Sequence, residues 1–185
     1  MMTRIAKIFL LTSILFNAHF MERAFASADS TLSLSYDIFG GGLNGATGFS
    51  LQYQSQQGGK GMVRPTLSGE ISEGTGKTGL GSVSLYEGDV GAGLAFLLTK
   101  SARLVPFINP SLRLGWASLS TGSSYADKSV GLCYGFNIAG GVILRLKDDS
   151  DAMGLLIATS YTLLPTTLSQ TGSFSNFQLT VGMTF

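Results

Sequence analysis

Hydrophobic and polar residues alternate along most of the chain after the first two dozen positions. The clearest stretch is 130–146, where apolar residues occupy most even positions from Val130 to Leu146, and Ile143 is the odd-numbered exception. Positions 177–185 alternate in the same way up to the last residue. Because successive side chains of a strand point to opposite faces, this period of two predicts strands with one apolar face.

Six further segments show the same alternation, which brings the number of expected strands to eight. They span 32–38, 49–54, 63–71, 80–98, 108–116 and 153–162. The connectors between strands are rich in Gly, Asn, Asp, Ser and Lys, as turns are: they cover 40–45, 57–61, 73–79, 99–102, 120–128, 147–151 and 164–173. Eight is the smallest even strand number of single-chain membrane barrels, and their short turns face the periplasm. The second, fourth and sixth connectors are therefore expected to be periplasmic.

Composition supports a membrane barrel and excludes other classes. Only 12% of the 185 residues are charged, against about 25% in average proteins. The net charge of +1 offers no basic excess for nucleic acid, and the single cysteine excludes a disulfide scaffold. After the N-terminal segment no apolar run approaches the roughly 20 residues of a membrane helix. A closed barrel is the other backbone arrangement that lipid tolerates.

The N-terminal segment has the pattern of a secretory signal peptide. It begins with Arg4 and Lys7, continues with a mainly apolar stretch over 8–16, and ends with small residues at Ala24 and Ala26. We therefore predict a cleaved signal peptide at 1–26 and a barrel domain at 27–185. An N-terminal membrane anchor is the alternative.

Charged residues recur on the polar faces of the expected strands. They are Asp37, Arg64, Glu70, Glu87, Asp89 and Arg113, with Arg145 on the same parity. An eight-stranded barrel has an interior just wide enough for side chains, and buried charges must be paired. Because acids and bases are nearly balanced, we predict a salt-bridged network that closes the lumen. Arg64, Glu70, Glu87 and Arg113 are expected near the middle of their strands. A narrow pore lined by the same residues is the alternative.

Aromatic residues are expected at both membrane interfaces, as in membrane barrels. On this topology the two belts contain Tyr36, Tyr86, Trp116, Tyr134 and Tyr161 toward the outside and Tyr53 and Phe96 toward the periplasm. A soluble lipocalin-like barrel is the competing interpretation, but such a barrel would carry charge on its outer surface.

The last strand ends in a pattern that resembles the C-terminal assembly signal of bacterial outer-membrane proteins. Its residues are Phe177, Leu179, Val181, Met183 and Phe185. Together with the signal peptide and eight amphipathic strands, this ending resembles the OmpA/OmpX-type superfamily of small outer-membrane barrels. The resemblance implies an all-β, antiparallel up-and-down barrel in the outer membrane of a Gram-negative-type bacterium. It also implies contact with outer-membrane lipids or lipopolysaccharide, and insertion by the barrel assembly machinery.

Motifs for cofactors and metals fail on inspection. The segment Gly74-Thr75-Gly76-Lys77-Thr78 resembles part of a phosphate-binding loop, but Ile71 stands where that motif requires glycine. Asp148, Asp149 and Asp151 lack the remaining ligands of a calcium-binding loop. No metal or cofactor is therefore expected.

The sequence also argues against an enzyme. Outer-membrane acyltransferases and deacylases, by resemblance, use a Ser-His arrangement. His19 is the only histidine, and removal of the signal peptide would remove it. We therefore expect a barrel with a structural or surface role. A narrow pore for small solutes and loop-mediated adhesion to an unknown surface ligand are the alternatives.

Overall fold

The computed structural model describes residues 29–56, 61–78, 81–99, 103–121, 128–146, 153–165 and 173–185. Eight strands occupy these ranges: β1 (Asp29–Gly41), β2 (Ala46–Gln56), β3 (Val63–Thr78), β4 (Gly81–Leu97), β5 (Leu104–Thr121), β6 (Lys128–Arg145), β7 (Gly154–Pro165) and β8 (Ser173–Thr184). Within these ranges there is no helix long and apolar enough to cross a membrane. The predicted signal peptide at 1–26 lies outside the described residues.

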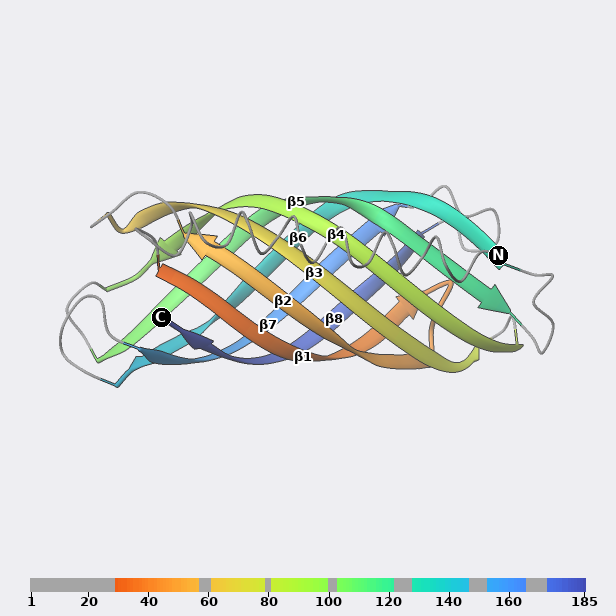
Figure 1. Ribbon diagram of the computed structural model, residues 1–185, viewed down its shortest axis with the longest axis horizontal. Coiled ribbons are helices and arrows are strands. Elements are labelled where there is room, and N and C mark those ends of the chain that lie inside the picture. Colours follow the sequence, from red (N-terminus) through yellow and green to blue (C-terminus); the bar gives the residue numbers. More distant parts are fainter. Residues whose placement is uncertain are drawn as a thin grey trace.

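The strands form one closed barrel in chain order (Figure 1). Each strand pairs antiparallel with the next, and β1 pairs with β8 to close the sheet, with Leu34 opposite both Leu51 on β2 and Val181 on β8. Closure leaves no open sheet edge with unpaired backbone groups. The predicted all-β, eight-stranded antiparallel up-and-down fold is confirmed.

The barrel has two ends with different boundaries. We call the end where β1 begins and β8 finishes the terminal end, at the left of Figure 1, and the opposite end the far end. The connector predicted at 73–79 is wrong, because β3 continues to Thr78, which pairs with Gly81. Outward-facing Glu73 and Lys77 are polar and exposed, so the apolar pattern ends here before the strand does.

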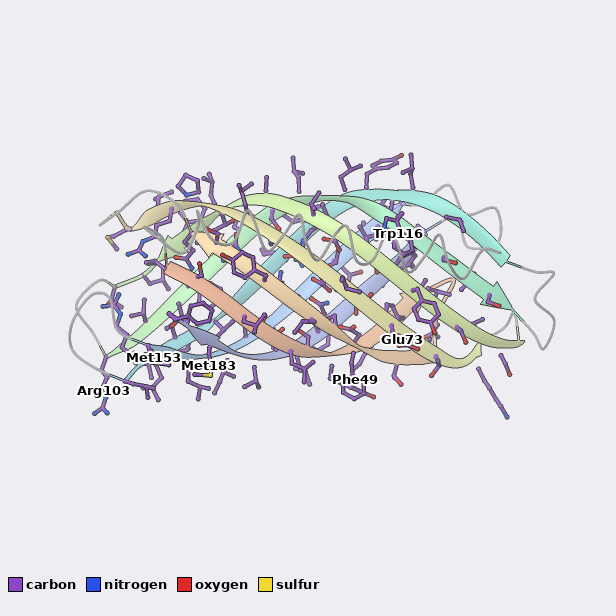
Figure 2. The ribbon with its side chains drawn as sticks, viewed as in Figure 1. Phe49, Glu73, Arg103, Trp116, Met153 and Met183 are labelled. Carbon is purple, nitrogen blue, oxygen red and sulfur yellow. The ribbon has the colours of Figure 1, made fainter. Side chains whose placement is uncertain are left out.

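The outer surface is apolar over most of the barrel height. Figure 2 shows Phe49 and Met183 projecting from the wall, and their side chains are exposed. Leu112 is 68% exposed and Val130 is 66% exposed, although both are aliphatic. An exposed apolar band around a closed barrel is what contact with lipid requires.

The interior is filled by three layers of different chemistry. Polar and charged side chains occupy the centre. The far-end apolar layer consists of Phe39, Leu43, Ala46, Val83, Leu85, Ala117, Leu119, Cys133, Leu164 and Phe174. The terminal-end apolar layer consists of Leu97, Val105, Phe107, Leu156 and Ala158, with Ile143 packed against it. The lumen is therefore polar only at its centre, because a narrow barrel fills its interior by close packing at every height.

The turn between β1 and β2 contributes a side chain to the far-end apolar layer. Gly41 and Gly45 have φ angles of 66° and 96°, a conformation that favours glycine. Between them Leu43 is completely buried, and its carbonyl accepts a hydrogen bond from the Ala46 N–H at 3.0 Å. The turn therefore folds into the barrel mouth.

The aromatic rings of the far-end layer also need space beside the wall. Phe39 and Phe174 meet edge-on, with ring centroids 6.3 Å apart. A Cβ atom on Gly74 would collide with the Phe39 ring. Glycine at this position of β3 therefore allows the ring to lie against the wall.

Candidate functional site: the central polar network

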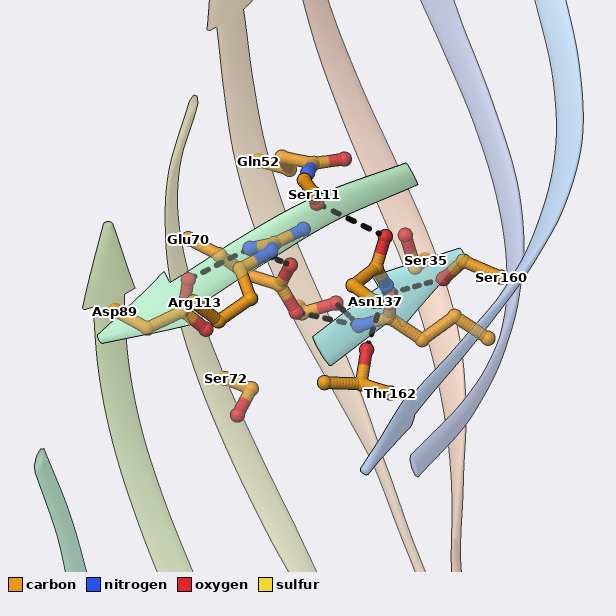
Figure 3. A network of polar contacts seen from close by, with 12 residues as sticks. Ser35, Gln52, Glu70, Ser72, Asp89, Ser111, Arg113, Asn137, Ser160 and Thr162 are labelled. Atoms are coloured by element: carbon orange, nitrogen blue, oxygen red, sulfur yellow. Dashed lines mark hydrogen bonds and ion pairs between the residues drawn. The ribbon is translucent and has the colours of Figure 1, made fainter. Parts of the chain in front are cut away.

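Arg113 is the centre of the polar layer. It projects inward from β5, and its Nη1 donates to Glu70 Oε2 on β3 at 3.0 Å and to Asp89 Oδ1 on β4 at 2.6 Å (Figure 3). Glu70 and Asp89 are themselves opposite each other in the β3–β4 register. All three side chains are at most 7% exposed. Charge-assisted bonds of this kind are stronger than neutral ones and gain further strength away from water.

Neutral side chains connect this ion pair to β1. Gln178 on β8 donates from Nε2 to Glu70 Oε1 and also to Ser50 Oγ at 3.1 Å. The Ser50 hydroxyl in turn donates to Asp37 Oδ1 at 3.1 Å. Ser160 on β7 donates to Gln178 Oε1 at 2.7 Å. The chain of bonds therefore crosses the lumen from Arg113 to Asp37.

Further polar contacts tie the remaining strands together. Asn137 on β6 donates to Thr162 Oγ1 on β7 at 2.6 Å and accepts from Ser111 Oγ on β5 at 3.4 Å. Ser72 donates to Glu87 Oε2 at 3.4 Å. Every strand thus contributes to polar contacts inside the barrel, and these contacts fill its middle.

The structure separates the predicted lumen residues into two groups. Asp37, Glu70, Glu87, Asp89 and Arg113 are all buried in the lumen. Arg64 is half-buried, is the second residue of β3 and donates from Nε to the Gly61 carbonyl at 3.3 Å. Its predicted mid-strand position is therefore wrong. Arg145 is likewise half-buried, as the last residue of β6.

This separation changes the charge balance of the lumen. Among the described side chains, the buried charged groups are four carboxyls and one guanidinium. The expected near-balance of acids and bases does not hold, because alternation gives the face of a residue and not its height along the barrel.

Several members of the network were not singled out from the sequence. They are Ser50, Asn137, Ser160, Thr162 and Gln178, together with Thr66 and Asn109, which are joined by a 3.3 Å hydrogen bond. All have the inward parity of their strands. Their polar character and inward parity were the available signal, but neutral polar side chains occur at many inward positions and do not by themselves indicate a network.

The predicted belt residues lie on the outer surface. Tyr36, Tyr86, Trp116, Tyr134 and Tyr161 are exposed, as is Phe96. Tyr53 is half-buried, and its hydroxyl lies 3.0 Å from Ser30 Oγ. Their proposed interfacial role remains a prediction.

The predicted assembly residues occupy alternate outward positions at the end of the chain. Phe177, Leu179, Val181, Met183 and Phe185 are all exposed. Phe185 exchanges both backbone hydrogen bonds with Ser30, at 2.8 and 2.9 Å. The last residue is therefore integrated into the β1–β8 seam.

We next consider metal-binding groups and the cysteine among the described residues. They contain no group of three or more His, Cys, Asp or Glu side chains that could hold a metal ion. Cys133 is buried in the far-end apolar layer. The network can therefore fill and rigidify the lumen, and it can hold charge there.

No protein-family model and no curated protein matches the chain. Among solved structures, Neisserial surface protein A is 15% identical with a TM-score of 0.68, over 85% of this chain and 95% of that chain. The outer membrane enzyme PagL is 11% identical with a TM-score of 0.51, over 82% of this chain and 97% of that one. Ail of Yersinia pestis is 14% identical with a TM-score of 0.48, over 86% and 99%.

These similarities show that the chain has the fold of the small eight-stranded outer-membrane barrels, as its resemblance to the OmpA/OmpX-type superfamily implied. They show nothing about its activity, since PagL is an enzyme on the same fold and function depends on the site rather than on the fold.

Proposed function

We propose that this protein is an integral outer-membrane barrel with a structural or surface role and a closed lumen. The observation that carries the proposal is the inversion of ordinary burial: Leu112 is 68% exposed while Arg113, the next residue, is 4% exposed. A soluble barrel gains stability from the opposite arrangement.

The three interior layers support a closed lumen. The ion pair at Arg113 fills the centre, and apolar side chains fill the lumen at either end of it. A hydrated ion crossing the far-end layer would lose its water among residues such as Leu43 and Phe174. The alternative of a narrow pore has no observation in its favour.

The membrane assignment is tested by cell fractionation and by gel migration before and after heating. We expect the mature protein in the outer-membrane fraction, with faster migration when unheated because the barrel stays folded in SDS. A soluble periplasmic protein without this shift would refute the assignment.

The closed lumen is tested by single-channel recording in planar bilayers. Neither the wild type nor Arg113→Ala should conduct, because the apolar layers remain in both. Steady conductance of the wild type would establish the pore instead. Conductance that appears only in Arg113→Ala would mean that the polar centre alone closes the lumen.

Export and insertion complete the proposal. We infer that the chain is exported through a cleaved signal peptide at 1–26, inserted by the barrel assembly machinery through its last strand, and surrounded by outer-membrane lipids or lipopolysaccharide. Deleting Phe185 should reduce insertion, because it removes the residue that pairs with Ser30. Normal assembly of the truncated protein would contradict this role.

We also propose that the protein has no enzymatic activity. His19 is the single histidine of the sequence and lies in the predicted signal peptide. Incubation of the purified protein with lipopolysaccharide should leave the lipid acyl chains unchanged by mass spectrometry, and loss or transfer of an acyl chain would overturn the proposal.

A further inference from the structure

The central polar network contains more acids than bases. Among the described side chains, the buried charged groups are Asp37, Glu70, Glu87, Asp89 and Arg113. If all of them are ionised, four negative charges face one positive charge. An uncompensated charge away from water is strongly unfavourable, so the lumen needs additional positive charge.

Two of the four carboxyls lack a full set of partners. Arg113 is bonded to Glu70 and Asp89. Among the described residues, Glu87 Oε1 and Asp37 Oδ2 find no hydrogen-bond partner, although the two residues are 4% and 0% exposed. Their other oxygens accept hydrogen bonds from the hydroxyls of Ser50 and Ser72, which carry no positive charge. These two buried acceptors therefore indicate where positive charge is missing.

Both acceptors belong to the acidic cluster. Asp37 connects to Glu70 through Ser50 and Gln178. Glu87 experiences the negative charges of Asp89, Glu70 and Asp37 and the positive charge of Arg113. Both carboxyls therefore interact with the charge on Glu70, Asp37 through hydrogen bonds and Glu87 electrostatically.

The other strands bring neutral groups to this region. Ser50, Asn137, Ser160, Thr162 and Gln178 come from β2, β6, β7 and β8. Arg64 lies six residues before Glu70 on β3, which is about 20 Å along a strand. Arg64 and Arg145 are therefore held near the terminal end.

The apolar layers on either side restrict what can supply the charge. The described residues offer no site of three or more His, Cys, Asp or Glu ligands for a metal ion, which disfavours a coordinated divalent cation. A metal ion would also have to lose its water to pass these apolar layers. We therefore propose that protons on the carboxyls of Asp37 and Glu87 supply the missing positive charge inside the closed lumen. This proposal rests on the closed lumen proposed above.

The test compares the wild type with the double variant Asp37→Asn/Glu87→Gln. The midpoint of heat unfolding, read from gel migration in detergent, is measured from pH 5 to pH 9 in sodium, potassium or choline chloride of equal ionic strength. In choline, raising the pH should lower the wild-type midpoint by several degrees more than that of the variant. The same fall is expected in sodium and in potassium chloride, and rescue by either ion at pH 9 would overturn the proposal because the charge would then come from an alkali ion.

The matched control is Glu73→Gln, which removes an exposed carboxyl on β3 and should respond like the wild type. Equal pH responses of the wild type and the double variant would overturn the proposal. If the double variant does not fold, the single variants replace it, and a wild type insensitive to pH overturns the proposal equally. Bilayer conductance of the wild type reports failure of the closed lumen separately.

Discussion

The central polar network and the far-end apolar layer are equally buried, but they depend on different physics. Asp37 and Leu43 are both 0% exposed. The centre depends on specific partners, so losing one group leaves others unsatisfied in a dry environment. The far-end layer depends on filled volume, so each loss scales with the cavity created.

Polar and apolar side chains thus occupy different levels of the narrow barrel interior. The ion pair joins residues of three neighbouring strands, of which Glu70 and Asp89 are register partners. The apolar layer needs no such register, and it accepts a side chain from the β1–β2 turn. The network that needs specific partners thus lies in the middle of the barrel, and apolar packing closes the mouth.

Removing the Arg113 guanidinium, which Glu70 and Asp89 share, should lower the stability of the barrel most. Arg113→Ala leaves the buried carboxyls of Glu70 and Asp89 without their partner and should lower the free energy of unfolding by about 3–5 kcal/mol. Urea unfolding in lipid vesicles measures the change. Arg103→Ala is the control, because that arginine is exposed. Equal stability of the two variants would mean that the ion pair contributes little.

The next effect tests the apolar layer. Leu43→Ala removes a completely buried side chain and should cost about 3 kcal/mol in the same assay. Leu112→Ala, on the lipid-facing surface, should cost less because lipid chains can fill the space. If Leu112→Ala lowers the free energy of unfolding as much as Leu43→Ala does, packing in the far-end layer contributes no more to stability than the lipid-facing surface.

Adding volume next to the far-end apolar layer should lower the free energy of unfolding by about 1–3 kcal/mol. Gly74→Ala introduces a Cβ that collides with the Phe39 ring, whereas at Gly69 the nearest atom to an added Cβ is 3.9 Å away. Unfolding midpoints should therefore fall for Gly74→Ala, remain near the wild type for Gly69→Ala, and recover in the double variant Gly74→Ala/Phe39→Leu. No recovery would assign the cost to the backbone instead.

Removing one neutral hydrogen-bond donor from the central polar network should change the free energy of unfolding least. Ser72→Ala removes the hydroxyl that donates to Glu87 at 3.4 Å, which should cost about 1 kcal/mol. Ser82→Ala, on the exposed part of β4, serves as the control. If Ser72→Ala leaves the free energy of unfolding unchanged, the hydrogen bond from Ser72 to Glu87 does not contribute to stability.

The sequence predicted the lipid-facing surface well because alternation is a local property. From Phe177 to Phe185, each second residue faces outward, as the pleat of a strand requires. The same parity placed Asp37, Glu70 and Arg113 inside. The pattern failed for the last part of β3, residues 73–78, because polar residues outside the apolar band resemble those of a turn.

The strand number, the two faces of the wall and the exclusion of most soluble classes can be read from the sequence, because they follow from a period of two and a low charge. The three-dimensional fold was needed to show which inward residues come together, so that Arg113 meets Glu70 and Asp89 while Arg64 remains near the terminal end. It also showed that Phe39, Leu43 and Phe174 meet in the far mouth. Height depends on the stagger between strands, and stagger arises from pairing around the whole closed sheet rather than from any single strand.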